Sequence, residues 1–366
     1  MNRSIETGVF IPTGRNGWIH SVNAPDTPGT FDHVLQVVQA AEAGGFDFVL
    51  SPGIWRGRKG PARHWMDSVE SITTTAALLQ ATSRIGVYGT VHVTVFPPAT
   101  IAKMMSTLDQ IGPGRTGLNL VTGSSYLDLA HVGLWNSELD HDERYDLAEE
   151  WVAVAKRLWT EDAVTHHGKF FETADATMGP KPSRLPPLLN AGASQRGFRF
   201  AAENCDVALV TGSDSLASLE TVARCRKMAE DMGNPSLKIF AAPVLVPGKS
   251  DQDARSRVEH FDAGVDVECL ADIAAGYERN PNTTQVSKES TTFTSGETSA
   301  ISPGSLVGSP ETLARRLATM VNEGGIDGFM FIVPDYLTDL DVIAAEVLPR
   351  LAEHGITCRD GATVGR

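Results

Sequence analysis

The chain has 366 residues, of which 42% are hydrophobic and 21% charged, and a formal net charge of −14. This negative charge disfavours nucleic acid as a partner, because contacts of Lys and Arg with phosphates supply most nucleic-acid affinity. No apolar run approaches the roughly 20 residues that span a bilayer, and we expect no secretory signal, since the first residues lack its apolar region and cleavage site. Four scattered cysteines without a CxxC pair favour reduced thiols over disulfides or a zinc site. We therefore expect a cytoplasmic α/β protein without a membrane or nucleic-acid partner.

Eight short apolar segments alternate with longer helical patterns along the chain. They are rich in Val, Ile and Phe and lack strict alternation, which is typical of parallel strands buried on both faces. The predicted strands are residues 7–12, 46–51, 85–92, 116–121, 188–191, 207–210, 239–245 and 328–333. Eight βα units favour a closed (β/α)8 barrel, the TIM barrel, over the alternative of an open doubly wound sheet. The glycines after the first strand, Gly14 and Gly17, lack the GxGxxG spacing of a dinucleotide-binding fold and predict a turn.

The segments between the predicted strands carry helix signals and two insertions. Residues 101–108 and 140–158 repeat apolar side chains at helical spacing. Ser309 and Pro310 predict the cap and first turn of a late helix. Residues 165–178 predict a small hairpin insertion, and residues 279–302, rich in Ser, Thr, Asn and Gly, predict a mobile loop or lid. We expect the whole chain, 1–366, to form one domain.

In such barrels the active site is built at the carboxyl-terminal ends of the strands. Here these ends carry mostly small, polar or glycine residues and few charges. They offer no paired carboxylates for glycoside hydrolysis, no lysine for Schiff-base chemistry and no cluster of metal ligands. This composition predicts that a cofactor carries the hard chemistry and that the site holds no metal.

Four residues near the strand ends are candidates for the site. Asn119 lies inside a buried strand, where its amide needs a partner, either a ligand or a core hydrogen bond. Thr90 and His92 have similar alternatives, since threonine suits strands and a buried histidine is about as often structural. Ser194 precedes a predicted helix, so that it either caps the helix or, with the exposed amides there, binds a phosphate.

Several motifs, in their order and spacing, resemble the bacterial luciferase-like flavin monooxygenases. Within that superfamily the chain is most similar to the pyrimidine (uracil) monooxygenases, and the likeness runs from about Gly8 to Ile332. The motifs are GVFIP (8–12), NGW (16–18), FDF (46–48), TSRI (82–85), NLVTG (119–123), ERYD (143–146), AGAS (191–194) and LVGS (306–309).

The resemblance implies a barrel that binds reduced FMN from a separate NAD(P)H-dependent flavin reductase and uses O2 as cosubstrate. A flavin (hydro)peroxide would then oxidise a small heterocyclic or aromatic compound, with ring or C–N bond cleavage as one outcome. Arg144, Tyr145 and Ser194 would hold the phosphate and ribityl chain, and Thr90 and Asn119 would form the oxygen pocket as catalytic residues. The cofactor contacts implied by the resemblance are Gly53, Ile54, Asn119, Asp128 (a glutamate in the family), Arg144, Tyr145 and Ser194. Homodimers or tetramers are common in the family.

This chain departs from the uracil enzymes where the substrate would bind. A lysine and a leucine that follow the second strand in those enzymes are Ile54 and Trp55 here, and a tryptophan is Ser124. The loss of a cation and the gain of an indole favour a more apolar or aromatic substrate than a carbonyl-rich ring. Trp55, His92 and Ser124 are therefore the expected substrate contacts.

Three alternatives to this function stay open from the sequence. The chain could be a pyrimidine (uracil) ring-opening monooxygenase proper, a deazaflavin-dependent oxidoreductase, or a flavin-binding barrel without enzymatic activity. Retention of Thr90, Asn119 and Arg144 together argues against the last of these.

Overall fold

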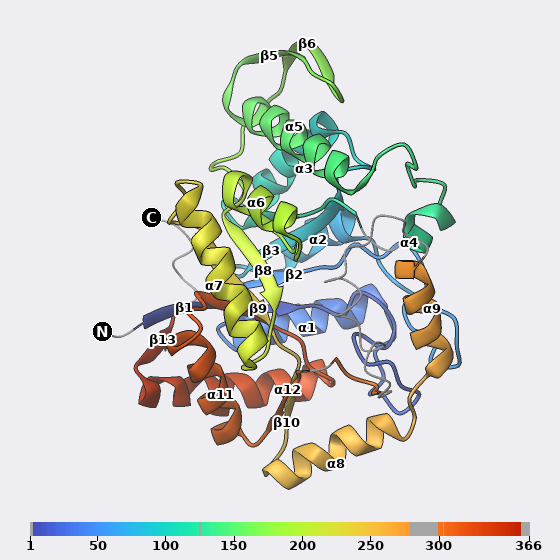
Figure 1. Cartoon of the computed structure of the whole chain (residues 1–366), viewed down its shortest axis with the longest axis vertical. Coiled ribbons are helices and arrows are strands. Elements are labelled where there is room, and N and C mark those ends of the chain that lie inside the picture. Colours follow the sequence, from blue (N-terminus) through green and yellow to red (C-terminus); the bar gives the residue numbers. More distant parts are fainter. Residues whose placement is uncertain (1–2, 124–125, 279–298, 303, 360–366) are drawn as a thin grey trace.

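The computed structural model of the chain describes residues 3–123, 126–278, 299–302 and 304–359. Eight parallel strands form a closed barrel surrounded by helices, which confirms the predicted (β/α)8 fold (Figure 1). Closure comes from the pairing of the first barrel strand with the last, where Glu6 lies opposite Gly328, so the sheet is not open. In their order around the barrel the strands are β1 (Arg3–Phe10), β2 (Phe48–Leu50), β3 (Gly86–His92), β4 (Thr116–Val121), β7 (Leu188–Asn190), β8 (Val207–Thr211), β9 (Lys238–Ala242) and β12 (Gly328–Phe331).

One predicted strand, residues 239–245, is wrong in its extent. The strand β9 ends at Ala242, before Pro243, which has no N–H to donate to a neighbouring strand, although Val244 still bridges to Ile332 beyond it. The chain then forms β10 (Leu245–Pro247), which pairs in parallel with β11 (Leu306–Gly308) beside the barrel. A short strand near the C-terminus, β13 (Ile356–Cys358), extends the sheet at the start of β1 and was also not predicted.

The helices follow the strands as the apolar spacing predicts. The predicted helical stretches 101–108 and 140–158 lie within α3 and α5, and Ser309 caps α11 with Pro310 in its first turn. Asp140 begins α5 with a capping box, because its side chain accepts from Glu143 N and Glu143 accepts from Asp140 N. The helices are α1 (Phe31–Ala43), α2 (Ser71–Ala81), α3 (Pro98–Ile111), α4 (Tyr126–His131), α5 (His141–Thr160), α6 (Gln195–Asn204), α7 (Leu216–Asp231), α8 (Asp251–Asp262), α9 (Val267–Glu278), α11 (Pro310–Asn322), α12 (Tyr336–Val342), the π-helix η1 (Ile343–Val347) and the 3₁₀-helix η2 (Leu348–His354).

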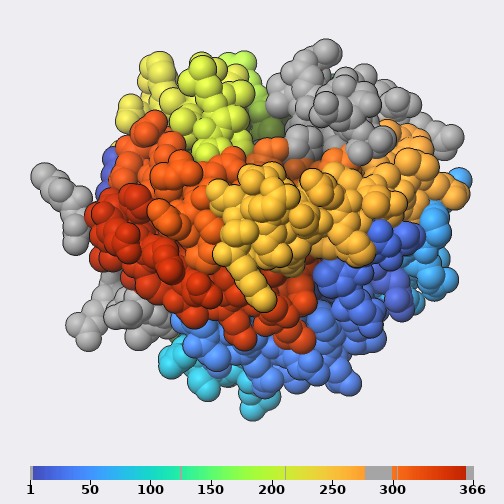
Figure 2. Space-filling view, turned by 90° about the horizontal axis from the view of Figure 1, so that it is seen from below, coloured from blue at the N-terminus to red at the C-terminus, as the bar shows by residue number. Residues whose placement is uncertain are grey.

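Two additions to the barrel differ in how well the sequence predicted them. The hairpin of β5 (Ala163–His167) and β6 (Glu172–Thr177) confirms the insertion predicted at 165–178 and projects from one end of the molecule (Figure 1). The pair α8 and α9 was not predicted; α8 lies across the face shown in Figure 2, between the C-terminal helices and an N-terminal segment. Of the predicted lid at 279–302, residues 279–298 lie outside the described residues. Ala300 and Ile301 are buried, because they pack beside Ile19 and Phe261.

The barrel interior is filled by large side chains below its carboxyl-terminal end. They are Phe48, Leu50, Tyr88, Leu189, Val207, Leu209, Phe240 and Met330. Gly8 makes room for this packing, since a Cβ there would lie 2.3 Å from the ring of Phe48. Tyr88, Thr90 and His92 alternate along β3 and therefore share its inner face. The packed layer thus places the polar side chains of Thr90 and His92 at the mouth of the barrel.

A buried carboxyl at the opposite, amino-terminal end gives a testable pH dependence. Oδ2 of Asp47 accepts hydrogen bonds from N and Oγ1 of Thr7, at 2.7 and 3.3 Å. Burial raises the pKa of Asp47 to about 6, against the hydrogen bonds from Thr7. The folded chain therefore binds this proton more tightly than the unfolded chain, whose aspartate pKa is near 4. It follows that the stability contributed by Asp47 is present below pH 4 and is lost as the pH rises to about 6.

We expect Asp47→Asn to remove this loss, because the neutral amide can still accept from Thr7 N. At pH 7.5 the free energy of unfolding of the variant should exceed that of the wild type by about 3 kcal/mol. The two should converge near pH 4, as measured by denaturant unfolding across that range. A difference that is the same at both pH values would show that Asp47 does not carry the effect.

The amino-terminal end also contains a cavity of about 500 Å³. Phe46, Arg84, Leu348 and Cys358 are among its lining residues, and none of the predicted site residues borders it. In barrels of this kind catalysis takes place at the carboxyl-terminal end. Within the described chain, no helix is long and apolar enough to cross a membrane.

Candidate active site

A buried hydrogen-bonded chain joins Thr90 and Asn119 at the barrel mouth. These residues lie opposite each other on β3 and β4. Thr90 Oγ1 donates to the carbonyl of Ser51 at 2.6 Å and accepts from Asn119 Nδ2 at 3.2 Å. Asn119 Oδ1 is buried and has no hydrogen-bond partner within the described chain. A buried acceptor in this state is costly, which points to a ligand that donates a hydrogen bond to it.

Two serines that the sequence did not single out hold Thr90 in place. Ser71 Oγ accepts from the backbone N of Thr90 at 2.7 Å and lies 2.5 Å from Ser51 Oγ. Ser51 follows the second barrel strand, and a polar residue at a strand end is a sequence signal that could have marked it as a site residue. Ser71 begins α2, and nothing in its sequence context indicates that it contacts β3.

His92 and Trp55 form a second pair beside Thr90. Trp55 Nε1 donates to His92 Nδ1 at 3.1 Å. His92 is only 3% exposed, and burial lowers its pKa to about 4, so the imidazole is neutral above about pH 5. Gly53 lies against both strand residues, because a Cβ on it would be 3.1 Å from His92 Cε1 and 3.2 Å from Thr90 Cγ2. The structure thus brings together four of the predicted residues, Gly53, Trp55, Thr90 and His92, with Asn119.

Ile54 is not part of this group in the structure. Ile54 points toward the turn after β1, where a Cβ on Gly14 would lie 2.9 Å from Ile54 Cδ1. Asn16 and Gly17 in that turn have positive φ angles, which agrees with the predicted turn. Ser124 lies outside the described residues.

A buried arginine lies at the start of α5. Arg144 is 5% exposed, and burial lowers the pKa of its guanidinium. Its Nη1 donates to the carbonyl of Leu139 at 3.1 Å, and its Cζ lies 5.4 Å from the ring centroid of Trp135. Among the described residues no carboxylate pairs with it. Gly123 allows its close approach, since a Cβ there would lie 2.7 Å from Arg144 Nε. A buried unpaired cation of this kind favours an anionic ligand.

The start of α6 lies beside Tyr145. Ser194 is the N-cap of α6 and accepts from Gly197 N at 3.0 Å, which bears out the capping alternative. The hydroxyl of Tyr145 lies close to two glycines, because Cβ atoms on Gly192 and Gly197 would be 2.5 and 2.7 Å from it. Asn190, which the sequence analysis missed, holds this turn by accepting from Gly192 N at 2.9 Å. The result is a glycine-lined helix N-terminus that approaches a tyrosine hydroxyl.

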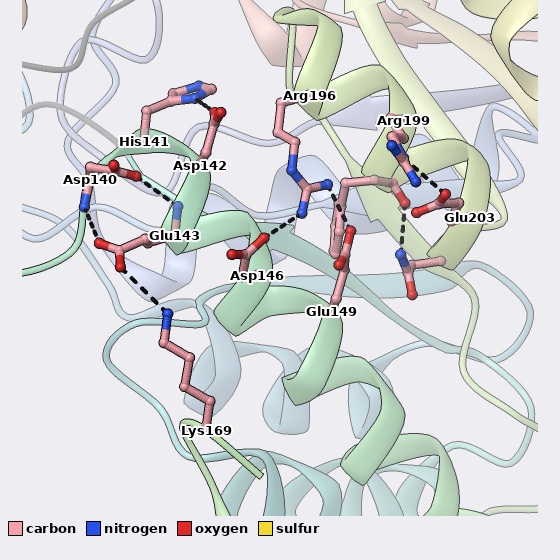
Figure 3. A network of polar contacts seen from close by, with 12 residues as sticks. Asp140, His141, Asp142, Glu143, Asp146, Glu149, Lys169, Arg196, Arg199 and Glu203 are labelled. Atoms are coloured by element: carbon pink, nitrogen blue, oxygen red, sulfur yellow. Dashed lines mark hydrogen bonds and ion pairs between the residues drawn. The ribbon is translucent and has the colours of Figure 1, made fainter.

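An ion-pair network on the outer side joins α5 to α6 (Figure 3). Arg196 donates to Asp146 at 2.9 Å and to Glu149 at 2.7 Å, and its guanidinium lies over the ring of Tyr145. Lys169 of the hairpin pairs with Glu143 at 3.4 Å. Arg196 is therefore paired with two carboxylates, whereas Arg144 pairs with none among the described residues.

Asp128, an implied cofactor contact, is paired with two arginines in the structure. Its carboxylate binds Arg58 through two contacts, of 2.5 and 3.0 Å, and lies 3.7 Å from Arg56 Nε. Arg56 in turn pairs with Asp272 of α9 at 2.5 Å. These four residues, here called the arginine–aspartate cluster, connect the segment after β2 with α4 and α9. The positive charges of Arg56 and Arg58 are thereby neutralised by carboxylates of the protein itself.

Comparison with known proteins assigns the chain to a family. Residues 5–328 match the family described as luciferase-like monooxygenase. The chain is 33% identical over 361 residues to the pyrimidine monooxygenase RutA of Klebsiella variicola (strain At-22), with 97% of each chain covered. It is 33% identical over 353 residues to RutA of Methylorubrum extorquens (strain PA1), covering 95% of this chain and 94% of that one. The chain therefore belongs to the luciferase-like monooxygenases, as its motifs predicted, and is an enzyme of that class.

A solved structure supports the same fold. The riboflavin lyase RcaE, solved with modified FMN and its substrate riboflavin, superposes with a TM-score of 0.83. It is 20% identical to this chain, and the match covers 99% of this chain and 94% of the other. At this identity the likeness concerns the fold alone.

Proposed function

We propose that this monooxygenase is the oxygenase component of a two-component flavin system. It would bind reduced FMN delivered by a separate NAD(P)H-dependent flavin reductase and use O2 to oxidise a small heterocyclic or aromatic compound. The observation that carries the proposal is a pair of unmet interactions at the barrel mouth. Within the part of the chain that the structure describes, Asn119 Oδ1 is a buried acceptor without a donor, and Arg144 is a buried cation without a carboxylate partner.

The residues present fit both the phosphate end and the isoalloxazine end of FMN. Arg144, Tyr145 and the N-terminus of α6 at Ser194 would hold the phosphate and ribityl chain, since an arginine and free backbone amides favour a phosphate dianion. Asn119 would contact the isoalloxazine ring, and Gly53 would pack near it. Asp128 does not fit a flavin contact, because Arg58 and Arg56 already occupy its carboxylate. Ile54 would lie beside the isoalloxazine ring.

Bound reduced FMN supplies the electrons that activate O2. The residues of the chain would position the reactants and exclude water from the site. Thr90 gives its only proton to Ser51 and so fixes Asn119 through the lone pair that remains. The second amide proton of Asn119 Nδ2 is then the donor available to orient oxygen and to stabilise charge that develops on it. The half-buried ring of Trp55 covers His92 at the edge of the site.

The substrate we propose is more apolar than uracil, although the relatives are named pyrimidine monooxygenases. Where the uracil enzymes carry a lysine, this chain has Ile54, and an indole follows at Trp55. Trp55, His92 and Ser124 are the proposed substrate contacts. We further propose a homodimer or tetramer.

The proposed function is tested by oxygen consumption with a generic flavin reductase, NADH and FMN, across a panel of heterocyclic and aromatic compounds that includes uracil. We expect at least one compound to increase oxygen uptake and to gain an oxygen atom by mass spectrometry, only when the reductase is present. Equal rates of FMN oxidation with and without every compound, with only peroxide formed, would contradict it. Turnover without oxygen, using a deazaflavin, would support the alternative cofactor.

A further inference from the structure

The hydrogen bond between Trp55 and His92 fixes the tautomer of the imidazole. An indole N–H can only donate, so His92 Nδ1, at 3.1 Å, must accept. Burial keeps this imidazole neutral. A neutral imidazole carries one proton, which must then be on Nε2. The neighbouring indole thus makes His92 a donor at Nε2.

The Nε2–H of His92 remains available at the barrel mouth. It makes no hydrogen bond with the described residues, and it is not among the fully buried side-chain atoms that lack a partner. It therefore keeps contact with solvent, although the residue as a whole is 3% exposed. Gly53 packs against the Nδ1–Cε1 edge of the ring, so the ring has little freedom to turn. A donor held in this way suits one acceptor in a fixed place.

The surroundings of this donor are aromatic and carry no free cation from the adjacent segment. The ring centroid of Trp55 lies 6.0 Å from that of Phe96, with the two planes tilted by 36°, and 6.5 Å from that of His92, with the planes at 62°. The rings of Trp55 and Phe96 thus form an aromatic wall beside the donor. Arg56 and Arg58, which follow Trp55 in the chain, are both held by carboxylates of the arginine–aspartate cluster. A substrate carboxylate would find no counter-ion in these two residues. The wall and the donor together favour an uncharged planar molecule with an acceptor on its edge.

We propose that His92 selects an uncharged planar substrate by donating from Nε2 to a carbonyl oxygen or ring nitrogen, and that Trp55 is the positioning residue that sets this tautomer. The proposal rests on the proposed function for its assignment of the substrate side of the site. It names a substrate class that carries at least one hydrogen-bond acceptor and no negative charge. Phe96 contributes to the wall but not to the choice of acceptor.

The first test measures binding of two probes of the same shape, quinoline and naphthalene, by equilibrium dialysis against the protein with and without FMN. Quinoline carries a ring nitrogen that can accept from His92, and naphthalene does not. We expect the wild type to bind quinoline about tenfold more tightly, as one neutral hydrogen bond allows. His92→Phe should abolish this preference. The control Phe96→Leu should weaken the binding of both probes by similar factors, so that the ratio of their affinities is unchanged.

The second test addresses Trp55 and uses nitrogen NMR of protein labelled at histidine. We expect the wild type to show His92 as the single Nε2–H tautomer, and Trp55→Phe, which keeps an aromatic ring, to show a mixture of tautomers and a smaller quinoline preference. An unchanged tautomer in Trp55→Phe would overturn the positioning role. Equal binding of the two probes to the wild type, binding of neither, or a preference that survives His92→Phe, would overturn the selection by His92. Because these readouts need no oxygenation, they remain separate from failure of the flavin chemistry.

Discussion

Replacing Asn119 with alanine is expected to lower substrate oxygenation at least a hundredfold while the barrel remains folded. Loss of a single preorganised donor at a site of developing charge costs about 10²- to 10³-fold in rate. The fold should tolerate the change, because among the described residues Asn119 makes one side-chain hydrogen bond, to Thr90, and Thr90 keeps its bond to Ser51. The measurement is the yield of oxygenated product per NADH consumed, together with urea unfolding.

A matched amide at the same end of the barrel provides the control. Asn190 uses both ends of its side chain within the protein, donating to Leu120 O at 2.8 Å and accepting from Gly192 N at 2.9 Å. Asn190→Ala should therefore destabilise the fold by about 2 kcal/mol, more than Asn119→Ala does. If Asn119→Ala keeps wild-type coupling of NADH to product, or if the two variants unfold alike, the assignment of Asn119 to the oxygen site is wrong.

The eight barrel strands could be predicted because each is a short apolar run that no helix period explains. The break at Pro243 was also visible in the sequence, since proline in a central strand argues against that strand. The helix α8 was not predicted from pattern alone, because its few apolar residues, such as Phe261, pack on a small separate cluster that includes Ile19 and Val246. That cluster joins segments far apart in the sequence.

Part of the candidate site could also be predicted from the sequence. Polar residues inside apolar strands, such as Thr90 and Asn119, stand out in the sequence and do lie together. The hydrogen-bond and ion-pair partners that determine the role of such residues lie far away in the sequence. Ser71 contacts Thr90 from a helix start, and Asp128 meets Arg58 across 70 positions of the chain. Only the fold shows that the Asp128 carboxylate is paired with arginines, whereas no carboxylate among the described residues pairs with Arg144.

Replacing Arg144 with alanine is expected to weaken FMN binding about 30- to 100-fold, which corresponds to about 2–3 kcal/mol for the loss of a buried charged contact. Without FMN the same variant should be at least as stable as the wild type. The reason is that a buried guanidinium without a carboxylate partner costs desolvation free energy, which the alanine removes. Dissociation constants from fluorescence titration of FMN and unfolding of the FMN-free protein measure the two effects.

Arg196 gives the matched control for this prediction, because it is an arginine of the same region whose partners are already present. Asp146 and Glu149 pair with it at a partly exposed position, where such ion pairs contribute about 0–1 kcal/mol. Arg196→Ala should change the affinity for FMN less than about threefold, and Arg144→Lys should restore part of the affinity that alanine loses, because it returns the charge without the planar fork. An FMN affinity unchanged in Arg144→Ala would remove Arg144 from the phosphate site. A loss of stability in the FMN-free variant would show instead that the guanidinium supports the fold through Leu139 and Trp135, and the opposite signs expected for binding and stability separate these two roles.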